Sequence, residues 1–152
     1  MKVEEQGGTL EVSLRALNHM ILADRLHLSN IIHNLLDNSI KYCNGAPHVK
    51  VTTETKGKNT ALVVSDQGMG IPHEFQHKVF EKFYRVPTGN IHNVKGFGLG
   101  LFYIKSICQA HGWKIELESQ PGDGTTICIL IPETPNSNLS KSPLRAENLP
   151  LS

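Results

Sequence analysis

Long apolar runs are missing from this sequence of 152 residues. No stretch reaches the roughly 18 apolar residues that a membrane-spanning helix needs, and the first residues lack the apolar core of a signal peptide. An excess of one charge is missing too, because 15 basic residues accompany 14 acidic ones. A nearly neutral chain gives no reason to expect a nucleic-acid partner or direct membrane contact. We therefore expect a cytoplasmic globular domain of ordinary size.

Cysteine is also sparse: Cys43, Cys108 and Cys128 are odd in number, far apart and set in apolar patterns. Disulfides and zinc sites need paired or clustered cysteines, so we expect reduced thiols in or near the core.

Residues 73–77 read His-Glu-Phe-Gln-His, the pattern of zinc proteases. That pattern requires a long helix and a third ligand, and neither is evident after Pro72. We expect an ordinary surface there.

The glycine-rich segment 95–101, Lys-Gly-Phe-Gly-Leu-Gly-Leu, is the most informative feature of the chain. Glycine lets the backbone approach a ligand closely, and a glycine loop that leads into a helix directs free N–H groups toward a phosphate. No Walker A sequence occurs. The segment is not a Rossmann fingerprint either, since the residues before it are polar rather than a strand. Because short glycine motifs also make turns, the neighbouring segments decide its meaning.

Hydrophobic periodicity predicts alternating strands and helices. We expect strands at residues 9–17, 49–55, 60–65, 113–119 and 125–131. We expect one helix from the N-cap Asp24 to about residue 43 and a second over 99–111 that ends at Gly112. A short helical segment is expected within 73–83 and a mobile one at 85–95. Residues 133–152, rich in Pro, Ser and Asn, are expected to form a disordered tail, with a docked segment as the alternative.

A polar stripe accompanies the apolar face of the first long helix. Asn34, Asn38 and Lys41 are spaced i, i+4 and i+7, which places them within about 60° of one another. Their amide oxygens suit a hard cation such as Mg, and the lysine suits a phosphate; the alternative is a solvated surface. Asp66 follows a buried strand and can accept a hydrogen bond from a ligand amino group, or can simply form a turn.

Four ordered segments resemble the motifs of sensor histidine kinases. Residues 34–42 (Asn-Leu-Leu-Asp-Asn-Ser-Ile-Lys-Tyr) resemble the N box, and residues 66–70 (Asp-Gln-Gly-Met-Gly) resemble the G1 box. Residues 80–85 (Phe-Glu-Lys-Phe-Tyr-Arg) resemble the F box, and the glycines of 96–101 resemble the G2 box. Residues 124–132 resemble the final strand. The chain thus resembles the catalytic, ATP-binding domain of a two-component histidine kinase.

The resemblance implies an α/β fold over residues 1–132, namely a two-layer sandwich of the Bergerat (GHKL) type with a mixed sheet and helices on one face. It implies ATP and Mg as cofactors and transfer of the γ-phosphate to a histidine. That histidine would lie on a dimerisation domain absent from this chain, and a response regulator would act downstream. The parent protein could be anchored in the inner membrane. The isolated chain is expected to be a monomer with little activity.

The same resemblance implies roles for individual residues. Asn38, with Asn34 beside it, would hold Mg, and Lys41 would contact phosphate. Arg85 would contact the γ-phosphate or a partner. Asp66 would accept a hydrogen bond from the adenine amino group. A lid over about 72–95 would be anchored by phenylalanines 80 and 83. The remaining implied nucleotide contacts are Tyr42, Gly68, Gly70, Ile71, Phe83, Lys95, Gly96, Phe97, Gly98, Leu99, Gly100, Leu101 and Thr126.

Position 34 bears on the class of reaction. Related GHKL ATPases carry a water-activating glutamate at this place, whereas this chain has Asn34, which cannot act as a base. A neutral imidazole needs no base, because one ring nitrogen has a free lone pair. The sequence therefore favours phosphoryl transfer to histidine. The alternatives are a GHKL-type ATPase and a catalytically silent nucleotide-binding module.

Overall fold

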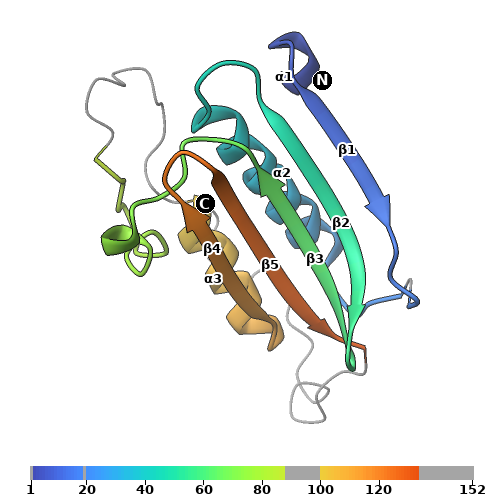
Figure 1. The fold of residues 1–152 in the computed structure, drawn as a ribbon. Helices are drawn as coiled ribbons and strands as arrows, with labels where there is room; N and C mark the ends of the chain where they lie inside the picture. Colours follow the sequence, from blue (N-terminus) through green and yellow to red (C-terminus); the bar gives the residue numbers. More distant parts are fainter. Residues whose placement is uncertain (1, 19, 88–99, 134–152) are drawn as a thin grey trace.

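A five-stranded mixed sheet in the order β1-β2-β3-β5-β4 forms one layer of the protein. The structure, a computed structural model, describes residues 2–18, 20–87 and 100–133. Figure 1 shows the two long helices side by side on one face of this sheet. This is the predicted two-layer α/β sandwich. The strands are β1 (Thr9–Leu14), β2 (His48–Lys56), β3 (Asn59–Asp66), β4 (Lys114–Gln120) and β5 (Gly124–Pro132). The helices are α1 (Lys2–Glu5), α2 (Arg25–Lys41), the 3-10 turn η1 (His73–Phe75) and α3 (Gly100–His111).

The edge strand β1 pairs in parallel with β2, and the other neighbouring strands pair antiparallel. Parallel strands require a crossover connection, and α2 supplies it. The β2–β3 hairpin places Val51 opposite Val64, and β3 in turn places Val64 opposite Ile127. These three side chains alternate onto the helix-facing side of the sheet, where all three are buried.

Helix α2 begins as the sequence predicts, at the N-cap Asp24. The Asp24 carboxylate accepts a hydrogen bond from the His27 N–H at 3.1 Å. This bond satisfies one of the free donors of the first turn and holds the pKa of Asp24 below its ordinary value. The helix ends at Lys41, two residues before the predicted end. There the Tyr42 carbonyl accepts from the Met69 N–H at 2.9 Å, so the chain turns toward the residues after β3.

The core lies between the helices and the sheet. Ile31 on α2, Ile104 and Ile107 on α3, and Ile129 on β5 are fully buried. Ile104 and Ile107 are three residues apart, so they share one face of α3. Cys108 is buried in the same core and Cys128 is buried on β5, and the three cysteines are free thiols. Burial raises the pKa of the Cys108 thiol to about 12, which makes it inert as a nucleophile. The expectation of free thiols in or near the core holds for Cys108 and Cys128, whereas Cys43 is only partly buried.

The structure differs from the sequence-based expectation in other places as well. Strand β1 stops at Leu14, not residue 17, because the Leu17 N–H bonds to the Thr55 side chain at 2.9 Å instead of continuing the ladder. Helix α1 was not predicted; its four residues are held by Val3, which is 1% exposed. The 73–83 segment contains only η1, so the two histidines of the zinc-protease pattern do not share a long helix.

No helix among the described residues is long and apolar enough to cross a membrane.

The turn before β5 packs directly against the end of β3. A Cβ at Gly124, where φ is +112°, would lie 2.0 Å from the Asp66 carbonyl oxygen. Gly122, in the same turn, has φ +84° but open space around it. We expect Gly124→Ala to lower the free energy of unfolding by about 2–4 kcal/mol and Gly122→Ala by only about 1 kcal/mol. Denaturant unfolding of both variants checks this, and equal losses would contradict the close packing.

Candidate functional site

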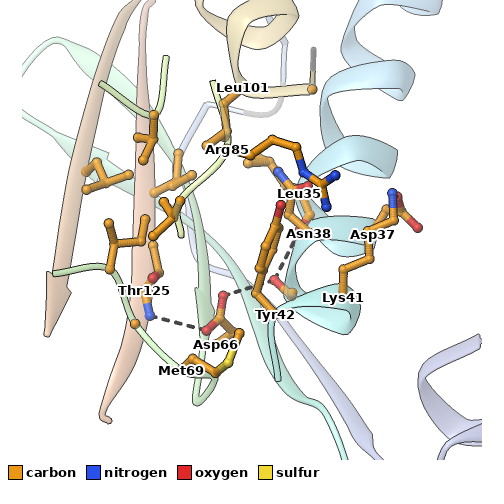
Figure 2. A pocket seen from close by; sticks show the side chains of 18 of the residues that line it. Leu35, Asp37, Asn38, Lys41, Tyr42, Asp66, Met69, Arg85, Leu101 and Thr125 are labelled. Carbon is orange, nitrogen blue, oxygen red and sulfur yellow. Dashed lines mark hydrogen bonds and ion pairs between the residues drawn. The ribbon is translucent and has the colours of Figure 1, made fainter. Parts of the chain in front are cut away.

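A cavity of about 610 Å³ lies beside the helix layer, within the usual range for a small-molecule site. Its walls come from α2, the segment after β3, residues 84–87 and the start of α3. Figure 2 shows Asp66 and Thr125 toward one end of the pocket and Arg85 and Leu101 toward the other. The floor is apolar, formed by Leu35, Val64, Val79, Leu117 and Ile127. A flat apolar group can therefore lie on this floor between two polar ends.

The asparagines of α2 form the polar side nearest α3. The Asn34 side-chain N–H donates to the Asn30 carbonyl oxygen at 2.8 Å, which directs the Asn34 amide oxygen the other way. A Cβ at Gly100 would lie 3.4 Å from that oxygen and 3.8 Å from the Asn38 amide. The first turn of α3 thus faces both asparagines, and its free N–H groups favour an anion.

This donor set fits Mg with phosphate. Mg prefers oxygen ligands and is usually held by few protein groups together with substrate phosphates. The amide oxygens of Asn34 and Asn38 would supply the oxygens, and the N-terminus of α3 would supply donors for the phosphate. Lys41 lines the same side and pairs with Asp37 at 2.8 Å. Since a half-exposed ion pair is worth little, the lysine can turn to a phosphate at low cost.

The carboxylate of Asp66 is the polar group at the opposite end. One oxygen, Oδ1, accepts from the backbone N–H groups of Gly68 at 2.9 Å and Thr125 at 3.2 Å. The other, Oδ2, accepts from the Ser39 hydroxyl at 3.2 Å. Burial raises the pKa of Asp66 above its ordinary value, and these three donors oppose the rise. The remaining lone pair of Oδ2 is available to a ligand donor.

The β4–β5 hairpin closes the pocket behind this carboxylate. The Ser119 hydroxyl accepts from the Ile71 N–H at 2.8 Å and donates to the Gly124 carbonyl at 3.0 Å. The Gln76 side chain donates to the carbonyls of Ile71 and Ser119 at 3.0 and 2.9 Å. Gly70, at φ +70°, has no room for a side chain, because its Cβ would lie 2.0 Å from the Gln120 carbonyl oxygen. These hydrogen bonds and the close packing at Gly70 hold the wall beside Asp66 in place without a ligand.

Most of the expected site residues in the described part of the chain line this pocket. They are Asn34, Asn38, Lys41, Tyr42, Asp66, Gly70, Ile71, Arg85, Gly100 and Leu101. The expected contacts Lys95, Gly96, Phe97, Gly98 and Leu99 lie outside the described residues, as does the 133–152 tail apart from Glu133.

Three expected contacts do not line the pocket. The Thr126 hydroxyl bonds to Ser65 at 2.8 Å on the opposite face of the sheet, while its neighbour Thr125 lines the pocket. Gly68 supports Asp66 through its N–H, and a Cβ there would meet the Tyr42 carbonyl at 2.5 Å. Phe83 is 63% exposed, with φ +65°.

The expected lid anchors also differ from each other. Phe80 lies against α3, with the Lys105 ammonium 5.5 Å from its ring centre, and Lys82 lies 5.8 Å from the ring of Phe102. These two cation–π contacts attach the 80–82 segment to α3. Phe83 is instead exposed to solvent, whereas Phe80 contacts Lys105 of α3.

Sequence reasoning missed several lining residues. Asp37, Ser39, Met69, Tyr84 and Thr125 all border the pocket. Strand alternation could have found Thr125, because residues 125, 127 and 129 share the face of the apolar core. Ser39 carried no comparable signal, since a serine in mid-helix usually bonds only to its own helix.

The sequence of this chain is similar to a known protein family and to named sensor proteins. Residues 23–135 match the model of the histidine kinase-, DNA gyrase B- and HSP90-like ATPase family. The sensor protein RprX of Bacteroides fragilis is 44% identical over 134 residues, which are 87% of this chain and 26% of RprX. The sensor-like histidine kinase SenX3 of Mycolicibacterium smegmatis is 36% identical, over 89% of this chain and 35% of its own length. The chain thus spans about a quarter to a third of these relatives.

Solved structures show the same fold. The mycobacterial sensor histidine kinase MprB superposes with a TM-score of 0.71 at 29% identity, covering 88% of this chain and 87% of that structure. Full-length ShkA, solved in complex with AMPPNP, superposes with a TM-score of 0.74 at 25% identity, covering 95% of this chain and 29% of ShkA.

Proposed function

This chain belongs to the histidine kinase-, DNA gyrase B- and HSP90-like ATPase family, and on that premise we propose that it binds Mg-ATP and donates the γ-phosphate to a histidine. The acceptor would lie on a dimerisation domain of the parent protein, and a response regulator would receive the phosphoryl group afterwards. The sensor-kinase relatives support this assignment. This chain spans only 26% and 35% of these two relatives, and the acceptor domain is part of the proposal.

The layout of the pocket is the observation that carries the proposal. An amino-group acceptor, Asp66, lies at one end, and an apolar floor leads from it to the asparagines that face Gly100. Adenine offers an amino donor and a flat apolar ring, while a triphosphate offers anionic oxygens. Each part of ATP therefore meets matching chemistry in order along the pocket.

The residues act by positioning and by charge neutralisation. Asn34 and Asn38 would hold Mg, which when bound supplies positive charge to the phosphates. Asn34 is a neutral amide already bonded to the Asn30 carbonyl, so it takes no proton from water. Lys41 and Arg85, both lining the pocket, would offset further phosphate charge. This set favours an acceptor that needs no deprotonation, which a neutral histidine satisfies.

Labelled ATP tests this reaction. We expect the chain to phosphorylate the isolated histidine-bearing dimerisation domain of its parent protein, with an acid-labile, base-stable product and little free phosphate. The chain alone should release phosphate very slowly, because position 34 carries a neutral asparagine and not a carboxylate that could activate water. Steady phosphate release without an acceptor would favour the ATPase alternative. Tight Mg-ATP binding with neither product would favour the silent nucleotide-binding module.

A further inference from the structure

Ser39 is a buried hydroxyl that connects two parts of the pocket. It lies on α2 directly after Asn38 and is only 4% exposed. Its hydroxyl oxygen is 3.0 Å from the Leu35 carbonyl oxygen and 3.2 Å from Asp66 Oδ2. Dashed lines in Figure 2 mark the hydrogen bonds of the Asp66 carboxylate. One hydroxyl hydrogen cannot serve both acceptors fully. The charged carboxylate is the stronger of the two.

This contact distinguishes the two oxygens of Asp66. Oδ1 is occupied by two backbone N–H donors. Oδ2, by contrast, has Ser39 as its only donor among the contacts of the described residues. Ser39 also lines the pocket, so Oδ2 is the oxygen that meets a ligand. Removing the hydroxyl would leave Oδ2 both less restrained and more easily protonated.

We infer that Ser39 is a positioning residue for base recognition: its hydroxyl keeps Asp66 a pure hydrogen-bond acceptor and so makes the pocket selective for a 6-amino purine over a 6-oxo purine. A carboxylate can only accept, which suits the amino group of adenine. A protonated carboxyl can donate, which suits the oxygen at position 6 of hypoxanthine. The inference rests on the proposed function, because it assumes that the base of the nucleotide meets Asp66.

Other titratable groups surround this carboxylate. Cys43, just past the end of α2, is close enough that the Asp66 charge adds to burial in raising the pKa of its thiol. Asp37, Lys41, Tyr42 and Arg85 also line the pocket. Because ATP and inosine triphosphate share the same triphosphate, the ratio of their affinities cancels most effects of these groups on phosphate binding.

Ser106 is a matched control within the same chain. Its hydroxyl donates to the Phe102 carbonyl at 2.9 Å, the same i to i−4 bond that Ser39 makes with Leu35. It lies on α3 and is not among the residues that line the pocket. Ser106→Ala therefore removes a helical serine without touching Asp66.

Calorimetry with Mg-ATP and Mg-inosine triphosphate on the full chain tests the inference. For Ser39→Ala at pH 7 we expect the ratio of ATP to inosine triphosphate affinity to fall about threefold to tenfold, the effect of one hydrogen bond. As the pH is lowered toward about 5, the ratio should fall further, and this decline should begin at a higher pH than in the wild type. Ser39→Cys, which keeps the shape but donates poorly, should shift the ratio in the same direction. Ser106→Ala should behave as the wild type.

Several outcomes would overturn the inference. A Ser39→Ala protein with the wild-type ratio and pH profile would do so, as would equal losses of affinity for both nucleotides, which indicate a merely structural role. Either result leaves the proposed function intact if the wild type binds Mg-ATP. A wild type that binds neither nucleotide would overturn the proposed function itself, and the role of Ser39 with it.

Discussion

Asn38→Ala is expected to weaken Mg-ATP binding about a hundredfold, because it removes a metal-ligand oxygen beside the triphosphate. The fold should remain intact, since alanine is a better helix former than asparagine. Calorimetry with excess Mg measures the loss. In the presence of a chelator the wild type and the variant should bind ATP with nearly equal, weak affinity, because the missing contact acts through the metal.

Asn30 provides a control for this experiment. It lies on the same helix, where its side chain donates to the Tyr103 hydroxyl at 3.3 Å, and it is not among the residues that line the pocket. Asn30→Ala keeps the backbone carbonyl that orients Asn34, so Mg-ATP affinity should change little. If Asn38→Ala bound Mg-ATP as tightly as the wild type, the assignment of Asn38 as a metal ligand would be wrong.

Asp66→Asn is expected to have opposite effects on binding and on stability. The amide presents a donor to the adenine amino group, so Mg-ATP affinity should fall by about 1–3 kcal/mol. Asparagine can keep the network, however: its oxygen can accept from Gly68 and Thr125 while its nitrogen donates to Ser39. The hydrogen of Ser39 then turns to the Leu35 carbonyl. No buried polar group is left without a partner, and no buried charge remains.

The pH dependence of stability follows from the pKa of Asp66, which is raised above 3.8 in the folded state by burial. A raised pKa means that the protonated form favours folding. Its contribution is complete below 3.8 and is lost as the pH rises through the folded-state value. At pH 7 the wild type therefore bears a cost that Asp66→Asn lacks. The variant should unfold at higher denaturant concentration than the wild type at pH 7, and the difference should shrink toward pH 4. A variant less stable at pH 7 would contradict this sign.

The sequence predicts much of this fold because its local signals agree with its tertiary packing. Asp24 caps α2 as its position before an apolar-periodic run predicts, and Gly112 follows α3 with φ +73°. The β2–β3 hairpin turns at residues 57–58, between the expected strands 49–55 and 60–65. Each of these signals involves residues only a few positions apart. What no local pattern specifies is the order of strands, in particular the parallel pairing of β1 with β2.

The sequence predicts which residues line the pocket where a motif specifies them. It does not do so where long-range contacts decide their position. Thr126 was expected at the pocket, but the register with β3 places it opposite Ser65 and turns its side chain away. Phe83 was expected as a lid anchor, but its side chain is 63% exposed, on a backbone with φ +65°. Ser39 gained its place only because α2 brings it within 3.2 Å of a carboxylate 27 residues later.

The central claim is that this pocket binds Mg-ATP with the base at Asp66 and the triphosphate at the asparagines of α2. Amide chemical-shift mapping by NMR with Mg-AMPPNP tests it most directly. We predict that the largest shifts fall on Gly68 and Thr125, whose N–H groups bind Asp66, and on residues 34–42 of α2. Saturable shifts elsewhere, such as on Lys50 and Lys114 of the helix-free sheet face, with these amides unmoved would contradict the account.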